Sequence, residues 1–302
     1  MQVTIGIPTF NRLEYLKQAI DSCLTQTYKP FEIVISDDST TDDTEAMVKE
    51  LQAKPLEVAI RYKRNKPGLR QVKNVNQLFD MAQGEYIVLL HDDDLLHKET
   101  LAVFKSVLEK DPAIDIVFGK QYIINDDGTL DIKKSEARNK GCYRTAYYET
   151  HQLKPIEAGL LQQFPNDCYM LKSHIAKAHG YSEGAKDACD FEFALRLGIN
   201  SYKIHFVNTY TAYYRLSAQS VTTGTDNDAA LTAYQLAKAT DVPQSSKALI
   251  NKWMVTQSAM ACMQAIHLKN KKEAWTLYFD PWHRKNILTV GGIKRFFMLL
   301  LK

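Results

Sequence analysis

Three adjacent carboxylates, Asp92, Asp93 and Asp94, directly follow a continuous apolar run at residues 86–90. Neighbouring negative charges repel one another unless a cation lies among them. A divalent metal ion that also holds a phosphate would balance them, because Mg²⁺ and Mn²⁺ bind few carboxylates and complete their shells with phosphate oxygens and water. The alternative interpretation is a solvated acidic turn ahead of the next helix.

Two further acidic positions bear on this choice. Asp37 and Asp38 end a second β-rich run at residues 31–36, where a carboxylate can accept hydrogen bonds from a base N–H or a ribose hydroxyl. Carboxyl ends of parallel strands meet at one edge of a sheet, so the two acidic strand ends predict a shared nucleotide-diphosphate site. Asp190 begins a predicted helix at residues 190–197, where a first-turn acid is also a common structural feature. A helix cap and turn is likewise the structural alternative for Asp37 and Asp38.

The elements that must position these acids alternate between strand and helix. This order predicts an α/β, Rossmann-like, mostly parallel sheet flanked by helices. Apolar runs predict strands at residues 3–7, 31–36, 58–62 and 86–90, with helices at 14–25, 41–51 and 70–83 between them.

The second half of the chain is less regular. We expect a strand at 114–119, a hairpin at 121–131 around Asp127-Gly128, a mobile polar loop at 133–150 and a strand pair at 203–214. A Thr/Gly/Asp-rich linker at 222–228 precedes helices at 229–239, 245–268 and 271–278. We therefore predict one domain at 1–222 with two halves, at about 1–120 and about 121–222. A C-terminal helical region at 223–302 follows it.

Composition narrows the class of protein. A net charge of +3 over 302 residues argues against a nucleic-acid partner. Five scattered cysteines without CxxC spacing argue against disulfides or a zinc site and predict a reducing compartment. We expect a cytoplasmic protein, since no apolar run approaches the ~20 residues that span a bilayer.

Several motifs together resemble the family 2 glycosyltransferases of GT-A fold, over residues 3–223. Members of that family transfer a sugar from a nucleotide-diphosphate donor with inversion at the anomeric carbon. The resemblance is carried by Ile7-Pro8-Thr9-Phe10-Asn11-Arg12, by residues 32–39, by residues 82–86 leading into His91-Asp92-Asp93-Asp94, by Gly180-Tyr181, by residues 190–197 and by Tyr214-Arg215.

The resemblance implies that residues 1–222 form the catalytic domain, with a nucleotide-sugar half at about 1–120 and an acceptor half at about 121–222. It also implies a role for each motif. Asp190 matches the family's general base, and Asp93 matches the ligand of the Mn²⁺ or Mg²⁺ cofactor, with Asp92 and Asp94 as further candidate ligands. The residues implied in donor binding are Pro8, Thr9, Asn11, Arg12, Asp38, Arg70, Lys73, Asp92 and Arg215.

His91 departs from the commonest family pattern, which has an aspartate at that position. The departure leaves open whether Asp93 or Asp94 is the main metal ligand. His91 itself is interpreted either as a hydrogen-bonded structural histidine or as a direct ligand.

The function implied is an inverting, metal-dependent transfer from a UDP-sugar to a hydroxyl of a glycan or polyprenyl-linked acceptor. Synthesis of a bacterial surface polysaccharide or glycoconjugate is the expected setting. One alternative is a non-catalytic nucleotide- or sugar-binding module. Another is a sugar-nucleotide pyrophosphorylase, which should carry a Gly-rich phosphate loop where this chain has Pro8-Thr9-Phe10-Asn11.

The C-terminal region offers two further contacts. Its long predicted helix at 245–268 should pack on the catalytic domain or on another copy of the chain. Residues 293–302 are apolar and basic, and are expected either to meet the inner face of a membrane through Lys294, Arg295 and Lys302 or to pack into a core or dimer interface.

Overall fold

The structure is a computed structural model that describes residues 1–217 and 227–301. The predicted domain boundary at residues 222 and 223, most of the predicted linker and Lys302 lie outside the described residues. The division into domains therefore stays a prediction.

Within the described residues, a mixed sheet of eight strands forms the centre of the molecule, in the order β3-β2-β1-β4-β7-β6-β8-β5. Its first four strands are mutually parallel and alternate with helices, which confirms the predicted α/β pattern. Both faces of β1, β2 and β4 are covered, which explains their nearly continuous apolar sequences. The elements of this half are β1 (Val3–Thr9), α1 (Leu13–Leu24), β2 (Glu32–Asp37), α2 (Asp43–Gln52), β3 (Ala59–Arg64), α3 (Arg70–Met81) and β4 (Tyr86–Leu89).

The other half of the sheet mixes antiparallel and parallel pairings. Strand β7 runs antiparallel to both β4 and β6, and β5 runs antiparallel to β8, whereas β6 and β8 are parallel. The elements here are β5 (Leu95–Leu96), α4 (Thr100–Lys110), β6 (Ile116–Asn125), α7 (Pro155–Leu160), β7 (Tyr169–Lys172), α8 (Ser173–His179), η1 (Glu183–Ala188), α9 (Cys189–Ile199) and β8 (Ile204–Leu216).

The predicted strand pair at 203–214 is wrong, because β8 is one long strand. It follows β6 through register shifts between Phe118 and Gln121, which bend the pair without ending it. Gly119 permits this bend, since a Cβ there would lie 2.5 Å from the carbonyl oxygen of Thr209. The predicted Asp127-Gly128 turn is present, but the returning strand is reduced to a single bridge between Ile124 and Leu130.

The predicted mobile loop at 133–150 is also wrong, because it forms α5 (Ile132–Gly141) and α6 (Ala146–Thr150). Helix α5 buries the polar side chains of Ser135 and Asn139 and so shows no apolar period in the sequence. The side chain of Asn139 bonds both the backbone N–H and the carbonyl of Gln121. Buried polar contacts, rather than an apolar stripe, fix this segment to β6.

Arg144, in the same segment, is 2 % exposed. Its guanidinium donates from Nε to the carbonyl of Gln163 at 2.8 Å and from Nη1 to Oε1 of Gln121 at 2.7 Å. Burial lowers the pKa of Arg144 to about 10. The guanidinium is thus a structural link between the α5–α6 segment and the centre of the sheet.

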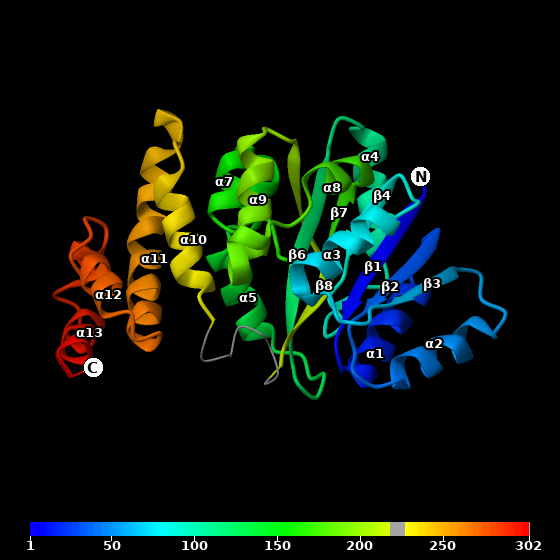
Figure 1. Cartoon of the computed structure of the whole chain (residues 1–302). Helices are drawn as coiled ribbons and strands as arrows, with labels where there is room; N and C mark the ends of the chain where they lie inside the picture. The colour runs from blue at the N-terminus through cyan, green and yellow to red at the C-terminus, as the bar shows by residue number, and fades with distance from the viewer. Residues whose placement is uncertain (218–226, 302) are drawn as a thin grey trace.

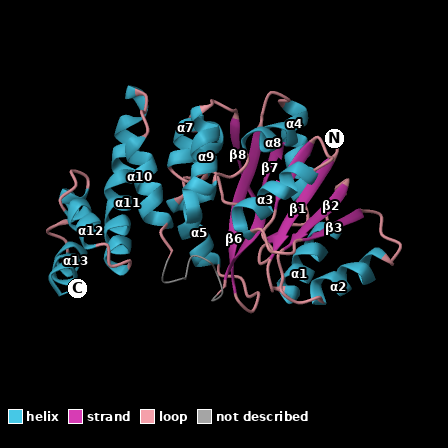
Figure 2. Ribbon diagram, viewed as in Figure 1, coloured by secondary structure: helices cyan, strands magenta, loops and turns pink. Residues whose placement is uncertain are grey.

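The C-terminal helices lie beside α7 and α9, on the side of the molecule away from β1–β3 (Figures 1 and 2). The rings of Phe191 in α9 and Trp253 in α11 stack with their centroids 5.9 Å apart. One buried apolar cluster continues from the sheet and α9 into these helices, so they pack on the sheet-containing part of the chain. They are α10 (Ala229–Ala239), η3 (Gln244–Ser246), α11 (Lys247–His267), α12 (Lys271–Tyr278), η4 (His283–Asn286) and α13 (Val290–Leu301).

Replacing Arg144 tests the assigned packing of the α5–α6 segment. Arg144→Ala leaves buried acceptors on Gln121 and Gln163 unpaired, so we expect the free energy of unfolding to fall by about 3 kcal/mol. Denaturant unfolding measures the change, with Lys133→Ala on the exposed side of α5 as the control. A free energy for Arg144→Ala equal to that of the control would show that the segment is not held in this way.

Candidate active site

A cavity of about 520 Å³ opens at the carboxyl ends of β1, β2 and β4. It brings together most of the residues predicted from the sequence to form a site. Asn11 and Lys73 are not among its lining residues. The lining is formed by Pro8, Thr9, Phe10, Arg12, Asp38, Gly68, Arg70, Gln71, Asn74, Val75, His91, Asp92, Asp93, Asp94, Asn166, Asp187, Asp190, Tyr214, Arg215 and Asn227.

Asp92 ties the acidic segment to the turn after β1. Its Oδ2 accepts the hydroxyl of Thr9 at 2.7 Å, and its Oδ1 lies 3.3 Å from Nη1 of Arg12. Burial, with the nearby charge of Asp93, raises the pKa of Asp92 to about 6 despite these partners. The same Arg12 nitrogen lies 2.8 Å from Asp93, so one guanidinium balances two carboxylates.

Asn11 acts on the turn itself. It adopts a left-handed backbone with φ of 55°, a conformation that asparagine tolerates better than most residues. Its backbone N–H donates to the hydroxyl of Ser39, and its Oδ1 accepts the backbone N–H of Thr40. Asn11 therefore joins the loops that follow β1 and β2.

Asp38 holds the start of α3. Its carboxylate accepts the backbone N–H groups of Leu69 at 3.0 Å and Arg70 at 2.7 Å, and Nδ2 of Asn65 at 2.9 Å. A carboxylate is favourable at a helix N-terminus, where the first N–H groups lack helical partners. This contact positions the exposed Arg70 at the cavity, while Lys73 lies in a neighbouring groove, 3.3 Å from Glu183.

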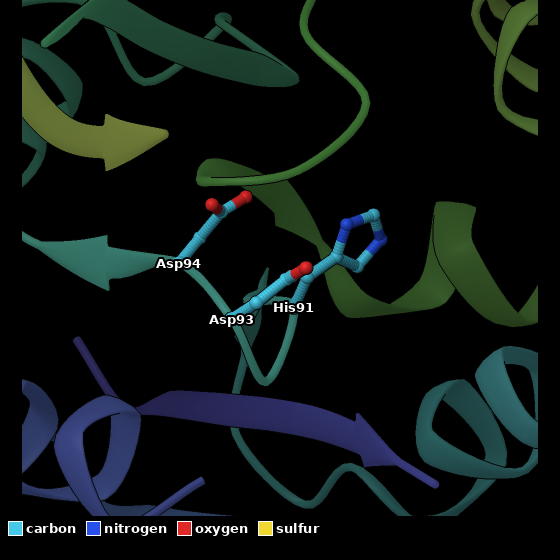
Figure 3. A group of neighbouring side chains, drawn as sticks. All are labelled: His91, Asp93 and Asp94. Atoms are coloured by element: carbon cyan, nitrogen blue, oxygen red, sulfur yellow. The ribbon is translucent and has the colours of Figure 1, made fainter. Parts of the chain in front are cut away.

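His91, Asp93 and Asp94 form a group whose potential ligand atoms all lie within 4.8 Å of one another (Figure 3). Two carboxylates and an imidazole suit a divalent transition metal such as Mn²⁺, whereas Mg²⁺ prefers oxygen ligands alone. Asp92 is not part of this group. The donor set therefore fits a metal ion held by Asp93 and Asp94, with His91 as the third candidate.

Asp94 is the most deeply buried carboxylate of the group. Its Oδ1 accepts the backbone N–H of Arg215 at 2.7 Å. Burial and the neighbouring Asp167 raise the pKa of Asp94 well above its usual range. A cation bound beside Asp94 would favour the ionised form and offset this penalty.

Asp167 is a site residue that the sequence reading missed. It is buried just before β7 and accepts the backbone N–H of His91 at 3.1 Å. Gln121, which bonds Arg144, also approaches Asp167 with its Nε2 at 3.5 Å. The sequence signal for Asp167 is only an acid just before the short apolar run at residues 168–171. Its role depends on the contact with the loop after β4.

Arg215 bonds the backbone of the acidic segment at residues 92–94. Its Nε donates to the backbone carbonyl of Asp93 at 2.8 Å, and its Nη1 and Nη2 donate to the carbonyl of Asp126 and to Gln18. The guanidinium is buried and largely engaged with the protein, although the residue lines the cavity. These contacts suit a residue that positions Asp93.

Asp190 enters the same cavity from the first turn of α9. Its Oδ1 accepts the backbone N–H of Phe191 at 2.7 Å. Burial raises the pKa of Asp190, whereas the proximity of His91 lowers it. A carboxylate with a raised pKa is a better proton acceptor, so the position suits a general base.

Asn227, just before α10, reaches the cavity from the C-terminal region.

The mixed sheet and the acidic cavity at its carboxyl edge define a GT-A architecture. The chain belongs to glycosyl transferase family 2, whose family model matches residues 4–168. The predicted family and fold are both confirmed.

Curated relatives agree with this assignment. An uncharacterized glycosyltransferase of Methanocaldococcus jannaschii is 27% identical over 71% of this chain and 70% of its own length. The GalNAc(5)-diNAcBac-PP-undecaprenol beta-1,3-glucosyltransferase of Campylobacter jejuni is 33% identical over 43% of this chain and 40% of its own. The chain thus spans less than half of the second relative.

Solved structures share the fold. The mannosyltransferase PcManGT of Pyrobaculum calidifontis, in complex with GDP-Man and Mn²⁺, matches with a TM-score of 0.64 and 17% identity over 99% of this chain and 87% of its own. Residues 1-349 of S. aureus TarS, in complex with UDP-GlcNAc, match with a TM-score of 0.59 and 16% identity over 98% and 79%.

Metal titrations test the His91–Asp93–Asp94 group. In the presence of UDP, we expect Asp93→Ala to weaken Mn²⁺ binding at least about tenfold, because it removes a direct ligand. We expect His91→Ala to weaken Mn²⁺ binding more than Mg²⁺ binding, because imidazole favours the transition metal. Isothermal titration calorimetry measures both affinities.

Exposed residues supply the controls for this titration. Asp80→Ala and His174→Ala remove the same chemical groups from exposed helix surfaces and should leave metal affinity unchanged. A Mn²⁺ affinity for Asp93→Ala equal to that of Asp80→Ala would exclude Asp93 as a ligand. An equal loss of Mn²⁺ and Mg²⁺ affinity in His91→Ala would exclude selection by the imidazole.

Proposed function

We propose that the protein is an inverting, metal-dependent glycosyltransferase that moves a sugar from a UDP-sugar to an acceptor hydroxyl. The observation that carries the proposal is the convergence of Asp190 and the His91–Asp93–Asp94 group on one cavity. Family membership supports the reaction class. The nucleotide sugars in the complexes of TarS and PcManGT support this class of donor.

In this proposal the donor nucleotide lies along the β1, β2 and β4 edge of the cavity. Pro8 and Thr9 line the nucleoside end, and Asp38 accepts from the base or ribose while it holds α3. Arg12 and Arg70 supply positive charge toward the diphosphate. Asn11 and Arg215 act by positioning the loops that carry these groups.

The metal in this proposal is Mn²⁺ or Mg²⁺, held by Asp93 and Asp94 with His91 beside them. When bound, it offsets the negative charge that builds up on the departing diphosphate. Asp92 keeps its contacts with Thr9 and Arg12 and orients the ribose end. The imidazole makes Mn²⁺ the better match.

Asp190 is the proposed general base. It takes the proton from the acceptor hydroxyl as that oxygen bonds to the anomeric carbon of the sugar. The bond from that carbon to the diphosphate oxygen breaks on the opposite face, so the configuration inverts. The raised pKa of Asp190 increases its affinity for the proton that it accepts.

The acceptor is proposed to be a glycan or polyprenyl-linked glycan of a bacterial surface polysaccharide or glycoconjugate. The undecaprenol-linked substrate in the name of the Campylobacter jejuni relative supports a lipid-linked acceptor. In the described part of the chain, every helix is too short or too polar to cross a bilayer. We propose a cytoplasmic setting at the inner membrane face and self-association through the C-terminal helices.

Substitution of Asp190 separates transfer from donor binding. We expect Asp190→Asn to lower the turnover number at least about 100-fold, because the amide cannot accept the proton. The Kd for UDP with Mn²⁺ should stay unchanged, since the metal group is intact. Glu192→Gln, in the same turn but bonded to Arg196, is the control.

Turnover and donor binding together distinguish a glycosyltransferase from a non-catalytic binding module. Sugar transfer is measured by UDP release from a panel of UDP-sugars and acceptors, and binding by calorimetry. Normal turnover by Asp190→Asn would remove Asp190 as the base. Donor binding without turnover in the wild-type protein would favour the non-catalytic binding module.

A further inference from the structure

Helix α13 and the residue stretch before it expose an unusual amount of apolar surface. Leu288 is 91% exposed and Leu301 is 85% exposed, although both are large aliphatic side chains. Large exposed apolar side chains gathered in one short stretch indicate a contact surface. The exposed face of α13 is defined here as Leu288, Val290, Ile293, Phe297, Leu300 and Leu301.

The spacing of these residues puts them on one stripe of the helix. Positions 290, 293, 297, 300 and 301 follow the three- and four-residue steps of an amphipathic face. The opposite side is buried through Gly292, Arg295 and Leu299. A Cβ on Gly292 would lie 2.0 Å from the carbonyl oxygen of Asn286, so this side is closely packed. Helix α13 therefore packs against the protein through one face and exposes its apolar face to solvent.

The charge of this stretch has one sign. Residues 281–301 contain no aspartate or glutamate, and Arg284, Lys285 and Lys294 are exposed cations within it. The preceding acid, Asp280, is buried against Tyr234 and Lys238. Residues 281–301 thus combine exposed apolar side chains with positive charge and contain no carboxylate side chain to balance it.

Arg295 does not belong to this basic set, contrary to the expectation from the sequence. It is buried, and its Nε donates to Nε2 of His283 at 3.0 Å. It fixes α13 to η4 instead of reaching a lipid. Lys302, the other predicted cation, lies outside the described residues.

We propose that the exposed face of α13 docks on a membrane surface that contains anionic lipids. Apolar side chains enter the boundary between headgroups and acyl chains, and the flanking cations contact the lipid phosphates. A second copy of the chain fits less well. A twofold contact places the same patch on both partners, so the cations around Lys294 would face one another without a carboxylate.

Docking through α13 would hold the protein beside a lipid-linked acceptor. In Figure 1, α13 lies at the lower end of the view, the end toward which the arrow of β1 points. This role for membrane docking rests on the proposed function, but lipid binding itself does not depend on nucleotide, metal or catalysis. The outcome of a vesicle assay is therefore independent of the glycosyltransferase proposal.

The test is flotation of the full chain with vesicles of phosphatidylcholine alone or of phosphatidylcholine mixed with phosphatidylglycerol. We expect binding to the anionic vesicles. Phe297→Asp should abolish it, and Lys294→Glu should weaken it at least about fivefold, since each cation near the surface contributes about 1 kcal/mol. The matched controls are Ile199→Asp, at a side chain 53% exposed, and Lys54→Glu on an exposed loop.

Each alternative result overturns the proposal. Wild-type protein that floats with neither vesicle, or Phe297→Asp protein that still floats, shows that the exposed face of α13 does not bind lipid. Equal binding to both vesicles removes the role of charge. A dimer in sedimentation that Phe297→Asp dissolves, without vesicle binding, assigns the face to a second copy. Circular dichroism of each variant verifies that it is folded.

Discussion

Mutual repulsion among Asp92, Asp93 and Asp94 is the constraint on which the cavity depends. The three carboxylates differ in how their charge is balanced. Arg12 pairs with Asp92 and Asp93, whereas Asp94 is buried beside Asp167 and has a raised pKa. A divalent cation would balance the remaining negative charge, because positive charge beside Asp94 lowers the free-energy cost of ionising it.

The acidic segment after β4 is held by elements that are far apart in the sequence. Thr9 at the end of β1 and Arg12 in the turn after it both bond this segment. Asp167, just before β7, and Arg215, near the end of β8, bond its backbone. The parallel half and the mixed half of the sheet therefore meet at the His91–Asp93–Asp94 group. Asp190 joins this group from α9, so the proposed base and the proposed metal ligands depend on the same packing.

The parallel half could be predicted because its strands are buried apolar runs and its acids follow strand ends. The segment at 133–150 could not, because α5 buries Ser135 and Asn139 and carries no apolar period. The single strand β8 depends on a bulge opposite Gly119, and the importance of Asp167 depends on a tertiary hydrogen bond. Arg295 looked like a surface cation and is instead buried against His283.

The most direct test of the account is the melting temperature of the wild-type protein with UDP, with and without Mn²⁺. A ligand that binds the native state stabilises it, by about 2.7 kcal/mol at 100 times its Kd. The account predicts a clear rise in Tm with UDP and Mn²⁺ together and a much smaller rise with UDP and EDTA. An equal rise in EDTA, or no rise with any nucleotide and metal, would contradict it.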